Sequence, residues 1–279
     1  MSATSSGTLY VVGTPIGNLG DLSARARSVL GAVDLIAAED TRRTRRLLSS
    51  IELNATLMAY HEHNEQQRTP VLIGRLQQGD SVALVSDAGM PSISDPGLRL
   101  VRAALAEKLP VVSVPGPTAV IAALTICGLA TDRFVFEGFL PRRSGPRRQR
   151  VEALLSESRT MVFYEAVHRI AATLETLAGL FGPDRPAAIA RELTKLHERV
   201  YTGTLAGLKS QLGNEIPLKG EFVLLVAGSA AVRSASTAEA QRIFAILSNE
   251  LSAKAAVALT AKITGLSRND VYQLTRLPD

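Results

Sequence analysis

Short runs of apolar and β-branched residues alternate with longer segments of helical pattern through most of this chain. Runs separated by roughly 10 to 15 helical residues are typical of an α/β fold with mostly parallel strand pairing. The length of 279 residues allows about two domains, and a hydrophobic content of 46% can fill their cores. The predicted strands are Thr8–Val12, Leu35–Ala38, Leu57–Tyr60, Val82–Ser86, Val111–Val114, Phe134–Glu137, Met161–Tyr164, Ala187–Arg191 and Phe222–Ala227.

The strand pattern ends before the last part of the chain. We expect an N-terminal α/β domain over residues 1–120, a second α/β domain over 121–233 and a helical tail over 234–279. In the tail, Ser236 with Glu239 forms a capping box, Gly265 ends a second helix, and Ser267 with Asp270 caps a third. Helices joined by a short glycine-containing turn predict a helix-turn-helix-like unit. Such a unit either contacts nucleic acid or packs on the main body or a second subunit, and the pattern leaves both open.

The composition of the chain indicates the cellular compartment in which it works. Cys127 is the single cysteine, so no intrachain disulfide can form. Residues 1–7 lack the basic start and apolar core of a signal peptide. No apolar run reaches the roughly 20 residues that span a bilayer. We therefore expect a cytoplasmic protein with no membrane partner.

Arginines are clustered in two places, although the formal net charge is only +5. Such clusters favour a polyanionic partner, and the alternative is solvated surface charge. Aromatic residues make up only 4% of the chain, so stacking surfaces for single-stranded nucleic acid are scarce. The candidate RNA-binding residues are Arg42, Arg43, Arg45 and Arg46 in the first cluster, and Arg142, Arg143, Arg147, Arg148 and Arg150 in the second.

Residues 82–97 are a buried strand followed by a loop rich in glycine, proline and aspartate. Open α/β sheets bind ligands at the carboxyl ends of their strands, so this loop predicts a small-molecule site. Asp87 offers a carboxylate there, suited to sugar hydroxyls or a cation. Asp95 could pair with Asp87 for acid–base work, but it precedes Pro96, and we expect it to cap the following helix.

Polar motifs follow seven of the predicted strands. Because carboxyl ends in a parallel sheet lie on one edge, the motifs should line a single cleft between the two domains. They are residues 13–18, 39–42, 61–64, 86–89, 115–118, 164–169 and 191–195.

Three other kinds of site can be considered for these residues: a dinucleotide-binding loop, a Walker A loop and a metal site. The first glycine loop resembles a dinucleotide fingerprint, but Pro15 has no N–H for a pyrophosphate and a fixed φ. No Walker A sequence occurs. His61 and His63 could supply two metal ligands, yet no clear third ligand lies nearby in the sequence, and we expect no metal.

Several motifs occur together and in order: LYVVGTPIGNLGDLSARA, DLIAAEDTRRTRRLL, YHEHNE, LVSDAGMPSISDPG, VPGPTAV, GFLPRR, VFYEAVHR, ARELTKLHE and GEFVLLVAG. They resemble the ribosomal small-subunit methyltransferase I family, within the tetrapyrrole-methylase-like class III methyltransferases. The resemblance implies two α/β domains of the tetrapyrrole methylase type, with S-adenosyl-L-methionine in the cleft between them. It also implies a homodimer that methylates the 2′ oxygen of a cytidine in the decoding centre of 16S ribosomal RNA, in the 30S subunit.

By the same resemblance, four strand-end segments contact the cofactor. Their residues are Pro15, Ile16 and Gly17; Asp87, Gly89 and Met90 at its ribose and methionine portion; Thr118 and Ala119 at its amino-acid end; and Tyr164 near its adenine. The wording departs from the family at Met90, where Thr is common, and at Ala166-Val167, where Ser-Pro is common.

A ribose 2′-hydroxyl is a weak acid, so a base or a nearby cation should assist its methylation. The candidate catalytic residues, chosen by their position after strands, are Glu39, Asp40, His61, Glu165, His168 and Lys195. Two alternatives stand beside this prediction. One is the same fold methylating a tetrapyrrole precursor, a polycarboxylate that would also attract arginine. The other is a non-enzymatic RNA-binding or ribosome-assembly factor.

Overall fold

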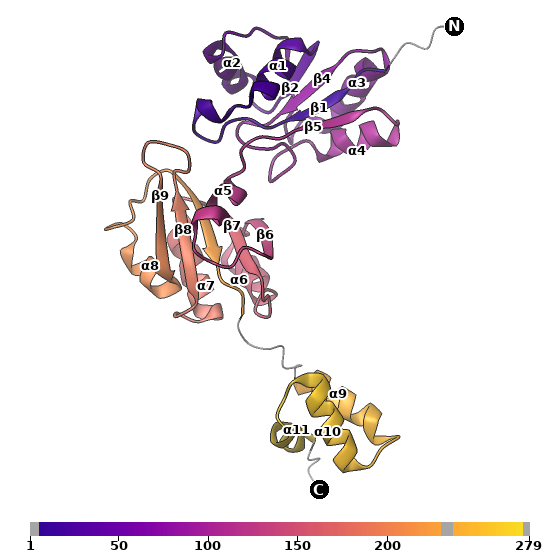
Figure 1. Cartoon of the computed structure of the whole chain (residues 1–279), viewed down its shortest axis with the longest axis vertical. Coiled ribbons are helices and arrows are strands. Elements are labelled where there is room, and N and C mark those ends of the chain that lie inside the picture. Colours follow the sequence, from indigo (N-terminus) through magenta and orange to yellow (C-terminus); the bar gives the residue numbers. More distant parts are fainter. Residues whose placement is uncertain (1–5, 230–236, 276–279) are drawn as a thin grey trace.

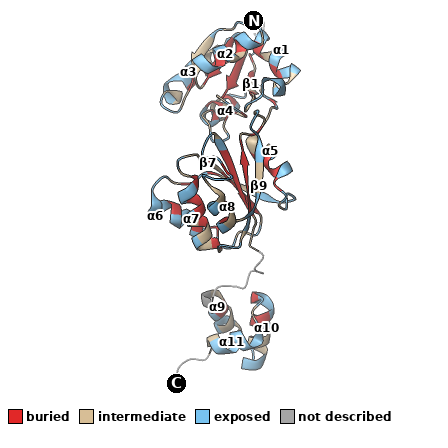
Figure 2. Ribbon diagram, turned by 90° about the vertical axis from the view of Figure 1, so that its left-hand side faces the viewer, coloured by how far each residue is buried: buried red, intermediate tan, exposed pale blue. Residues whose placement is uncertain are grey.

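The computed structural model describes residues 6–229 and 237–275. Two α/β units and a small helical unit follow one another along the chain (Figure 1). The central strands of each sheet are buried, and the helices around them expose their outer faces (Figure 2). The predicted fold class, two α/β domains and a helical tail, is confirmed.

The first unit is a parallel five-stranded sheet in the order β3-β2-β4-β1-β5. Its central strands are fully buried apolar runs, as expected when helices cover both faces of a parallel sheet. Helices α3 and α4 pack on one face, and α1 and α2 on the other. The strands are β1 (Leu9–Val12), β2 (Leu35–Ala38), β3 (Leu57–Ala59), β4 (Val82–Val85) and β5 (Val111–Val114), and the helices are α1 (Ala24–Ala32), α2 (Thr41–Ser50), α3 (Glu65–Gln77) and α4 (Leu98–Ala106).

The second unit is a mixed sheet in the order β6-β7-β10-β8-β9. Only β6 and β7 pair in parallel, so the expectation of mostly parallel pairing is wrong here. Strands β7 and β8 nevertheless run the same way, because each is antiparallel to β10 between them. The strands are β6 (Phe134–Phe139), β7 (Thr160–Ala166), β8 (Pro186–Arg191), β9 (Arg199–Thr204) and β10 (Glu221–Val226).

Helix α5 (Ala119–Ile126) packs on the second sheet, with Val120, Ala123 and Leu124 in its core. The sequence boundary at residue 120 therefore cuts a helix that belongs structurally with the second unit. The opposite face of this sheet is covered by α6 (Ser144–Glu152), α7 (Ile170–Phe181) and α8 (Leu205–Gln211).

The helical unit consists of α9 (Thr237–Ser248), α10 (Ala253–Thr264) and α11 (Arg268–Thr275), which pack on one another. Gly265 ends α10 with φ of 73°, as predicted for a left-handed cap. Ser267 Oγ accepts a hydrogen bond from the Asp270 backbone N–H, which confirms the predicted cap of the third helix. The predicted cap at Ser236 lies outside the described residues.

Glycines let the loops after β1 and β5 touch. A Cβ on Gly13 would lie 2.6 Å from the Gly116 Cα, and one on Gly116 would lie 2.8 Å from the Gly13 Cα. The loop after β4 joins them, because Thr14 and Gly89 exchange two backbone hydrogen bonds of 2.9 and 3.0 Å. These contacts fix three loops at the carboxyl edge of the first sheet.

Replacing Gly13 by Ala should destabilise the protein by about 1–3 kcal/mol, since the added methyl overpacks against backbone that cannot move aside cheaply. The measurement is chemical denaturation of Gly13→Ala and of the control Gly74→Ala. A Cβ on Gly74, inside α3, would meet nothing within 4 Å. The control should therefore be neutral or stabilised by about 0.4–1 kcal/mol. Equal stability of the two variants would contradict a tight glycine contact at position 13.

Candidate functional site

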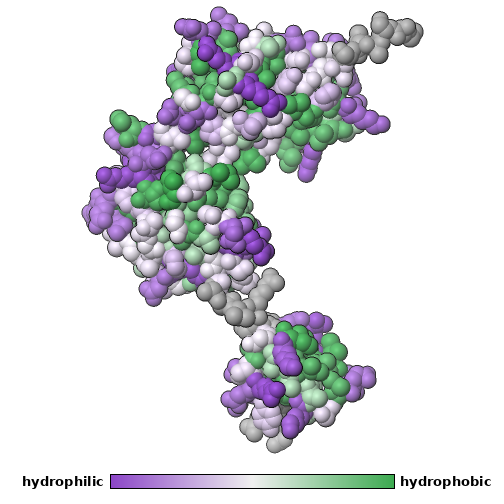
Figure 3. Space-filling view, viewed as in Figure 1, coloured by the Kyte–Doolittle hydropathy of each residue, from purple (hydrophilic) through white to green (hydrophobic). Residues whose placement is uncertain are grey.

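An apolar cavity of about 440 Å³ lies where the carboxyl edges of the two sheets meet. Figure 3 shows apolar surface gathered on the second unit, just below the first. Of the residues expected at the cofactor, Ile16, Gly89, Met90, Thr118, Ala119 and Tyr164 line this cavity. The cavity thus draws on the loops after β1, β4, β5 and β7, as the motif positions predicted.

Three residues that the resemblance implied do not line the cavity: Pro15, Gly17 and Asp87. Gly17 instead packs across the junction, where a Cβ would lie 2.5 Å from Lys195 Cγ and 2.9 Å from Thr194 Oγ1. The contact of Gly17 with the loop after β8 therefore joins the two units beside the cavity.

Tyr164 forms an aromatic wall of the cavity. Its ring centroid lies 4.9 Å from that of Phe136 and 5.6 Å from that of Phe139, at inclined angles. Burial raises the pKa of the Tyr164 hydroxyl, so this group stays neutral. Phe139 lies within the motif GFLPRR, but its role could not be predicted, because an exposed residue at a strand end carries no pattern of its own.

The N-terminus of α5 opens onto the same cavity. Thr118 is its N-cap, and its side chain accepts a hydrogen bond of 3.2 Å from the Ile121 backbone N–H. Thr118 and Ala119 both line the cavity. A helix N-terminus favours anionic groups, so this end of the cavity suits a carboxylate.

A second, polar cavity of about 1020 Å³ adjoins the first. Glu39, His61, His63, Arg99 and Arg102 are among its lining residues. The two arginines lie three residues apart near the start of α4, a helical spacing that places them on one face. They lie outside the two arginine clusters, so nothing in the sequence indicated a binding role for them.

Ser94 and Asp95 line both cavities. Helix α4 begins at Leu98 and its N-cap is Gly97, so the prediction that Asp95 caps this helix is wrong. Burial raises the pKa of the Asp95 carboxyl to about 6, and the nearby charges of Glu39 and Asp87 add to this, while a hydrogen bond with Ser86 opposes it. Asp95 is therefore a residue of the candidate site, although the sequence favoured a helix cap for it.

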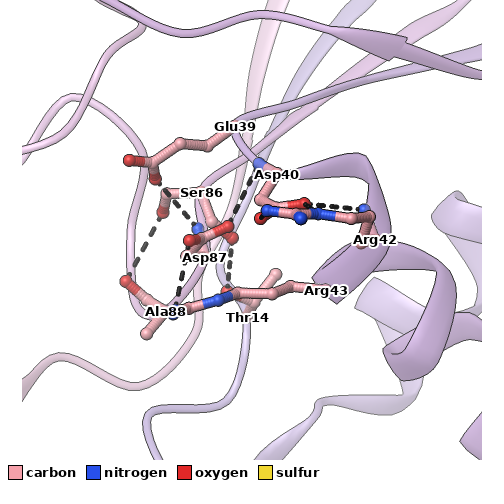
Figure 4. A network of polar contacts seen from close by, with 8 residues as sticks. All are labelled: Thr14, Glu39, Asp40, Arg42, Arg43, Ser86, Asp87 and Ala88. Carbon is pink, nitrogen blue, oxygen red and sulfur yellow. Dashed lines mark hydrogen bonds and ion pairs between the residues drawn. The ribbon is translucent and has the colours of Figure 1, made fainter.

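A polar network ties the loop after β4 to the loop after β2 (Figure 4). The Asp87 backbone N–H donates to Glu39 Oε2, and the Asp40 backbone N–H donates to Asp87 Oδ1, both at 3.1 Å. Asp87 Oδ2 also lies 3.2 Å from Arg43 Nη1. The Asp87 carboxylate is thus held within the first unit, turned away from the apolar cavity.

Asp40 has a structural role in the same network. It is the N-cap of α2, and the hydrogen bonds from Arg42 hold the pKa of its carboxyl far below the usual range. A carboxylate with so low a pKa is a poor proton acceptor. Asp40 is therefore unsuited to the catalytic role expected of it.

Glu165 is buried and fully engaged. Its Oε2 accepts a hydrogen bond from Thr173, its Oε1 accepts from the Ala166 N–H, and the same Oε1 lies 3.2 Å from Arg169 Nε. It lines the apolar cavity, but these partners fit a structural role. The neighbouring His168 is exposed and lines neither cavity.

Lys195 is a fixed cation. Its Nζ lies 2.9 Å from Glu192 and 2.8 Å from Glu221. Burial would lower the pKa of Lys195, but the hydrogen bonds to Glu221 and Glu192 outweigh it and raise the pKa. Lys195 therefore stays charged and cannot act as a base. Of the six expected catalytic residues, Glu39 and His61 are those that line the polar cavity.

Five of the nine arginines expected to bind RNA are engaged by side chains of the protein itself. Arg147 is buried, and its Nε donates to Thr176 at 3.1 Å, so it is unsuited to hold a phosphate. Ion pairs also engage Arg42 with Asp40, Arg43 with Asp87, Arg148 with Glu152 and Arg150 with Glu137. The cluster members that are exposed and in no ion pair within residues 6–229 are Arg45, Arg46, Arg142 and Arg143.

Two negative findings concern the part of the chain that the structure describes. Across residues 6–229 and 237–275, no three His, Cys, Asp or Glu side chains are grouped so that they could hold a metal ion. Within those same ranges, every helix is too short or too polar to cross a bilayer.

Comparison with known proteins shows the family. Residues 8–209 match the family model described as Tetrapyrrole (Corrin/Porphyrin) Methylases, and residues 234–275 match the one described as RsmI C-terminal HTH domain. The chain is 52% identical to the ribosomal RNA small subunit methyltransferase I of Xylella fastidiosa (strain Temecula1), over 95% of this chain and 98% of that protein. It is 47% identical to the protein of that name from Escherichia coli O157:H7, over 96% and 94%.

Solved structures share the fold at lower identity. A cobalt precorrin-4 methyltransferase aligns with a TM-score of 0.59 and 16% identity, over 79% of this chain and 94% of that one. A uroporphyrin-III C-methyltransferase from Thermus thermophilus, in complex with S-adenosylhomocysteine, gives a TM-score of 0.55 and 18% identity, over 79% and 97%.

Removing the Glu165 carboxylate should cost about 3–5 kcal/mol of stability, because the charge of Arg169 is left in a largely buried position without its partner. Chemical denaturation of Glu165→Ala measures this. The control is Glu175→Ala, which removes from α7 an exposed partner of Lys209 and should cost less than about 1 kcal/mol. A fully stable Glu165→Ala protein would show that the carboxylate is kept for another reason.

Proposed function

This chain belongs to the ribosomal RNA small subunit methyltransferase I family, and from this membership we propose that it transfers a methyl group from S-adenosylmethionine to the 2′ oxygen of a cytidine in 16S ribosomal RNA. The sequence motifs that resemble the family imply the cytidine and its place in the decoding centre. The observation that carries the proposal is the pair of adjoining cavities, one apolar and one polar, that share Ser94 and Asp95.

The apolar cavity fits S-adenosylmethionine. Its volume of about 440 Å³ is in the range of small-molecule sites. Tyr164 and Phe139 offer aromatic surface for an adenine, and the N-terminus of α5 at Thr118 and Ala119 suits the carboxylate of the methionine end. When bound, the cofactor supplies a methyl group on a positively charged sulfur.

The polar cavity suits the acceptor nucleotide. Arg102 lines this cavity and makes no ion pair within residues 6–229, so its guanidinium can contact a phosphate, whereas Arg99 lies 3.2 Å from Glu65. Glu39 and His61 offer groups that hydrogen bond to a ribose. Holding the acceptor still beside the cofactor can lower the barrier by roughly 7–11 kcal/mol.

Contacts farther along the RNA are proposed for the exposed arginines. Arg45 and Arg46 extend from α2, and Arg142 and Arg143 precede α6. They are spread over both units, which fits a structured RNA or the assembled 30S subunit better than a small polycarboxylate. We also propose a cytoplasmic homodimer, which agrees with Leu196 being 94% exposed in the single chain.

The substrate test adds S-adenosylmethionine with a labelled methyl group to the purified protein with 30S subunits, naked 16S RNA or a porphyrin precursor. We expect label in the 30S subunit or its RNA, recovered after digestion as 2′-O-methylcytidine. Label in the porphyrin alone would replace the proposal with the tetrapyrrole alternative. No transfer to any acceptor, with cofactor binding intact, would favour a non-enzymatic RNA-binding protein.

Replacing Arg142 and Arg143 together by Gln should weaken RNA binding and reduce its salt dependence. Each lost phosphate contact should lower the slope of log affinity against log salt by about 0.7–0.9. Titration at several salt concentrations measures this, with Arg148→Gln as control, since Arg148 is paired with Glu152. A slope unchanged in the double variant would show that these arginines do not contact phosphate.

A further inference from the structure

Asp95 lies at the junction of the two cavities. Of the described residues, Ser94 and Asp95 alone line both, and Asp95 is the one of them whose side chain ionises near neutral pH. The proposed function needs the cofactor on one side of this junction and the ribose on the other. A group at position 95 is therefore placed to touch the reacting hydroxyl.

The loop that carries Asp95 is held in an unusual backbone conformation. Ser92 has φ of 70° and Ser94 has φ of 63°, in the left-handed region that non-glycine residues rarely adopt. Such conformations cost free energy and cluster at functional sites, where the surrounding structure holds them. Ser94 also faces the second unit, since a Cβ on Gly138 of β6 would lie 3.2 Å from Ser94 Oγ. The residue directly before Asp95 thus contacts the second unit across the cleft.

We propose that Asp95 accepts the proton of the acceptor ribose 2′-hydroxyl during methyl transfer, an assignment that rests on the proposed function. The 2′ oxygen forms the new bond to the methyl carbon, and its O–H bond breaks. The bond from sulfur to that carbon breaks and leaves its electron pair on sulfur. The proton passes to an oxygen of the Asp95 carboxylate and from there to water.

Glu39 and His61, the two expected catalytic residues that line the polar cavity, are less well placed to take this proton. Glu39 Oε2 already accepts from the Asp87 N–H, at 3.1 Å. His61 Nε2 lies 3.2 Å from Asn64 Nδ2. Neither residue lines the apolar cavity, where the methyl donor would lie.

The charges around Asp95 suit this role. Its facing groups are Glu39 after β2, Asp87 after β4, Tyr164 of β7 and, around the polar cavity, His61, Glu62, His63, Glu65, Arg99 and Arg102. Burial first, and then Glu39 and Asp87, raise the pKa of the Asp95 carboxyl to about 6. A base with a pKa just below neutral is both ionised at pH 7 and a better proton acceptor than an ordinary aspartate.

The test compares the wild-type protein with D95N in single-turnover methylation of 30S subunits from pH 5 to 8. In the wild type the rate should fall about tenfold per pH unit below about 6, because the protonated carboxyl cannot act as a base. In D95N the rate should be about 100- to 10,000-fold lower, and this acid limb should be absent. The matched control is D184N, an exposed aspartate at the far end of β8, which should keep both rate and limb.

A second variant and a readout without turnover separate this role from a structural one. E39Q keeps an acceptor for the Asp87 N–H but removes a negative charge beside Asp95, so the acid limb should move to lower pH. In carbon NMR of protein labelled at aspartate carboxyls, one resonance should titrate near pH 6 in the wild type and be missing in D95N. S-adenosylhomocysteine affinity and thermal unfolding establish that each variant is folded.

The outcomes are distinct. A D95N rate within threefold of the wild type, or an acid limb that persists in D95N, overturns the assignment and points to His61. An acid limb unmoved in E39Q also counts against it, including where D95N fails to fold. If the wild type methylates no ribosomal RNA while its aspartate resonance titrates near pH 6, the proposed function fails, and the assignment fails with it.

Discussion

The contact between the Gly13 and Gly116 backbones is the constraint on which the site depends. The loops after β1 and β5 approach so closely that a Cβ on Gly13 would lie 2.6 Å from the Gly116 Cα, and one on Gly116 would lie 2.8 Å from the Gly13 Cα. The two backbone hydrogen bonds between Thr14 and Gly89 then attach the loop after β4. Three loops from different strands thereby form one surface, which becomes a wall of the apolar cavity. Met90 directly follows Gly89 in the sequence, and its sulfur would lie 2.6 Å from a Cβ on Gly13.

The polar network beside this wall explains why so few of the expected residues are free to act. Asp87, Glu39 and Asp40 mainly satisfy one another's backbone groups and the nearby arginines. Buried polar groups without partners are costly, and this edge of the sheet concentrates them. A carboxylate that serves as a base must be partly buried and not held by a cation. Asp95 is partly buried and makes no ion pair within residues 6–229, and its side-chain hydrogen bond is with the neutral Ser86.

Most of the fold could be predicted because a buried strand has a continuous run of apolar residues in its sequence. All nine predicted strands are present in the structure. Strand β9 was missed because it lies at the sheet edge and none of its residues is fully buried, so Arg199–Thr204 carries no such run. Antiparallel pairing could not be predicted from strand-like runs alone, since these do not encode direction. In the site, positions after strands brought Ile16, Gly89 and Thr118 to one cavity. The partner of Arg147, Thr176, comes from α7, 29 residues along the chain, and no local pattern reveals it.

The irregularity in β6 has a consequence for how this architecture can diverge. The register between β6 and β7 shifts between Phe136 and Gly138, and Gly138 has φ of 64° against Ser94 of the other unit. A larger residue at 138 would be strained in its own backbone and would press on Ser94. The identities at 94 and 138 are therefore coupled across the cleft, although the two residues belong to different α/β units. A chimaera that exchanges one α/β unit with a relative would have to carry both positions together, so the two units are less modular than their separate cores suggest.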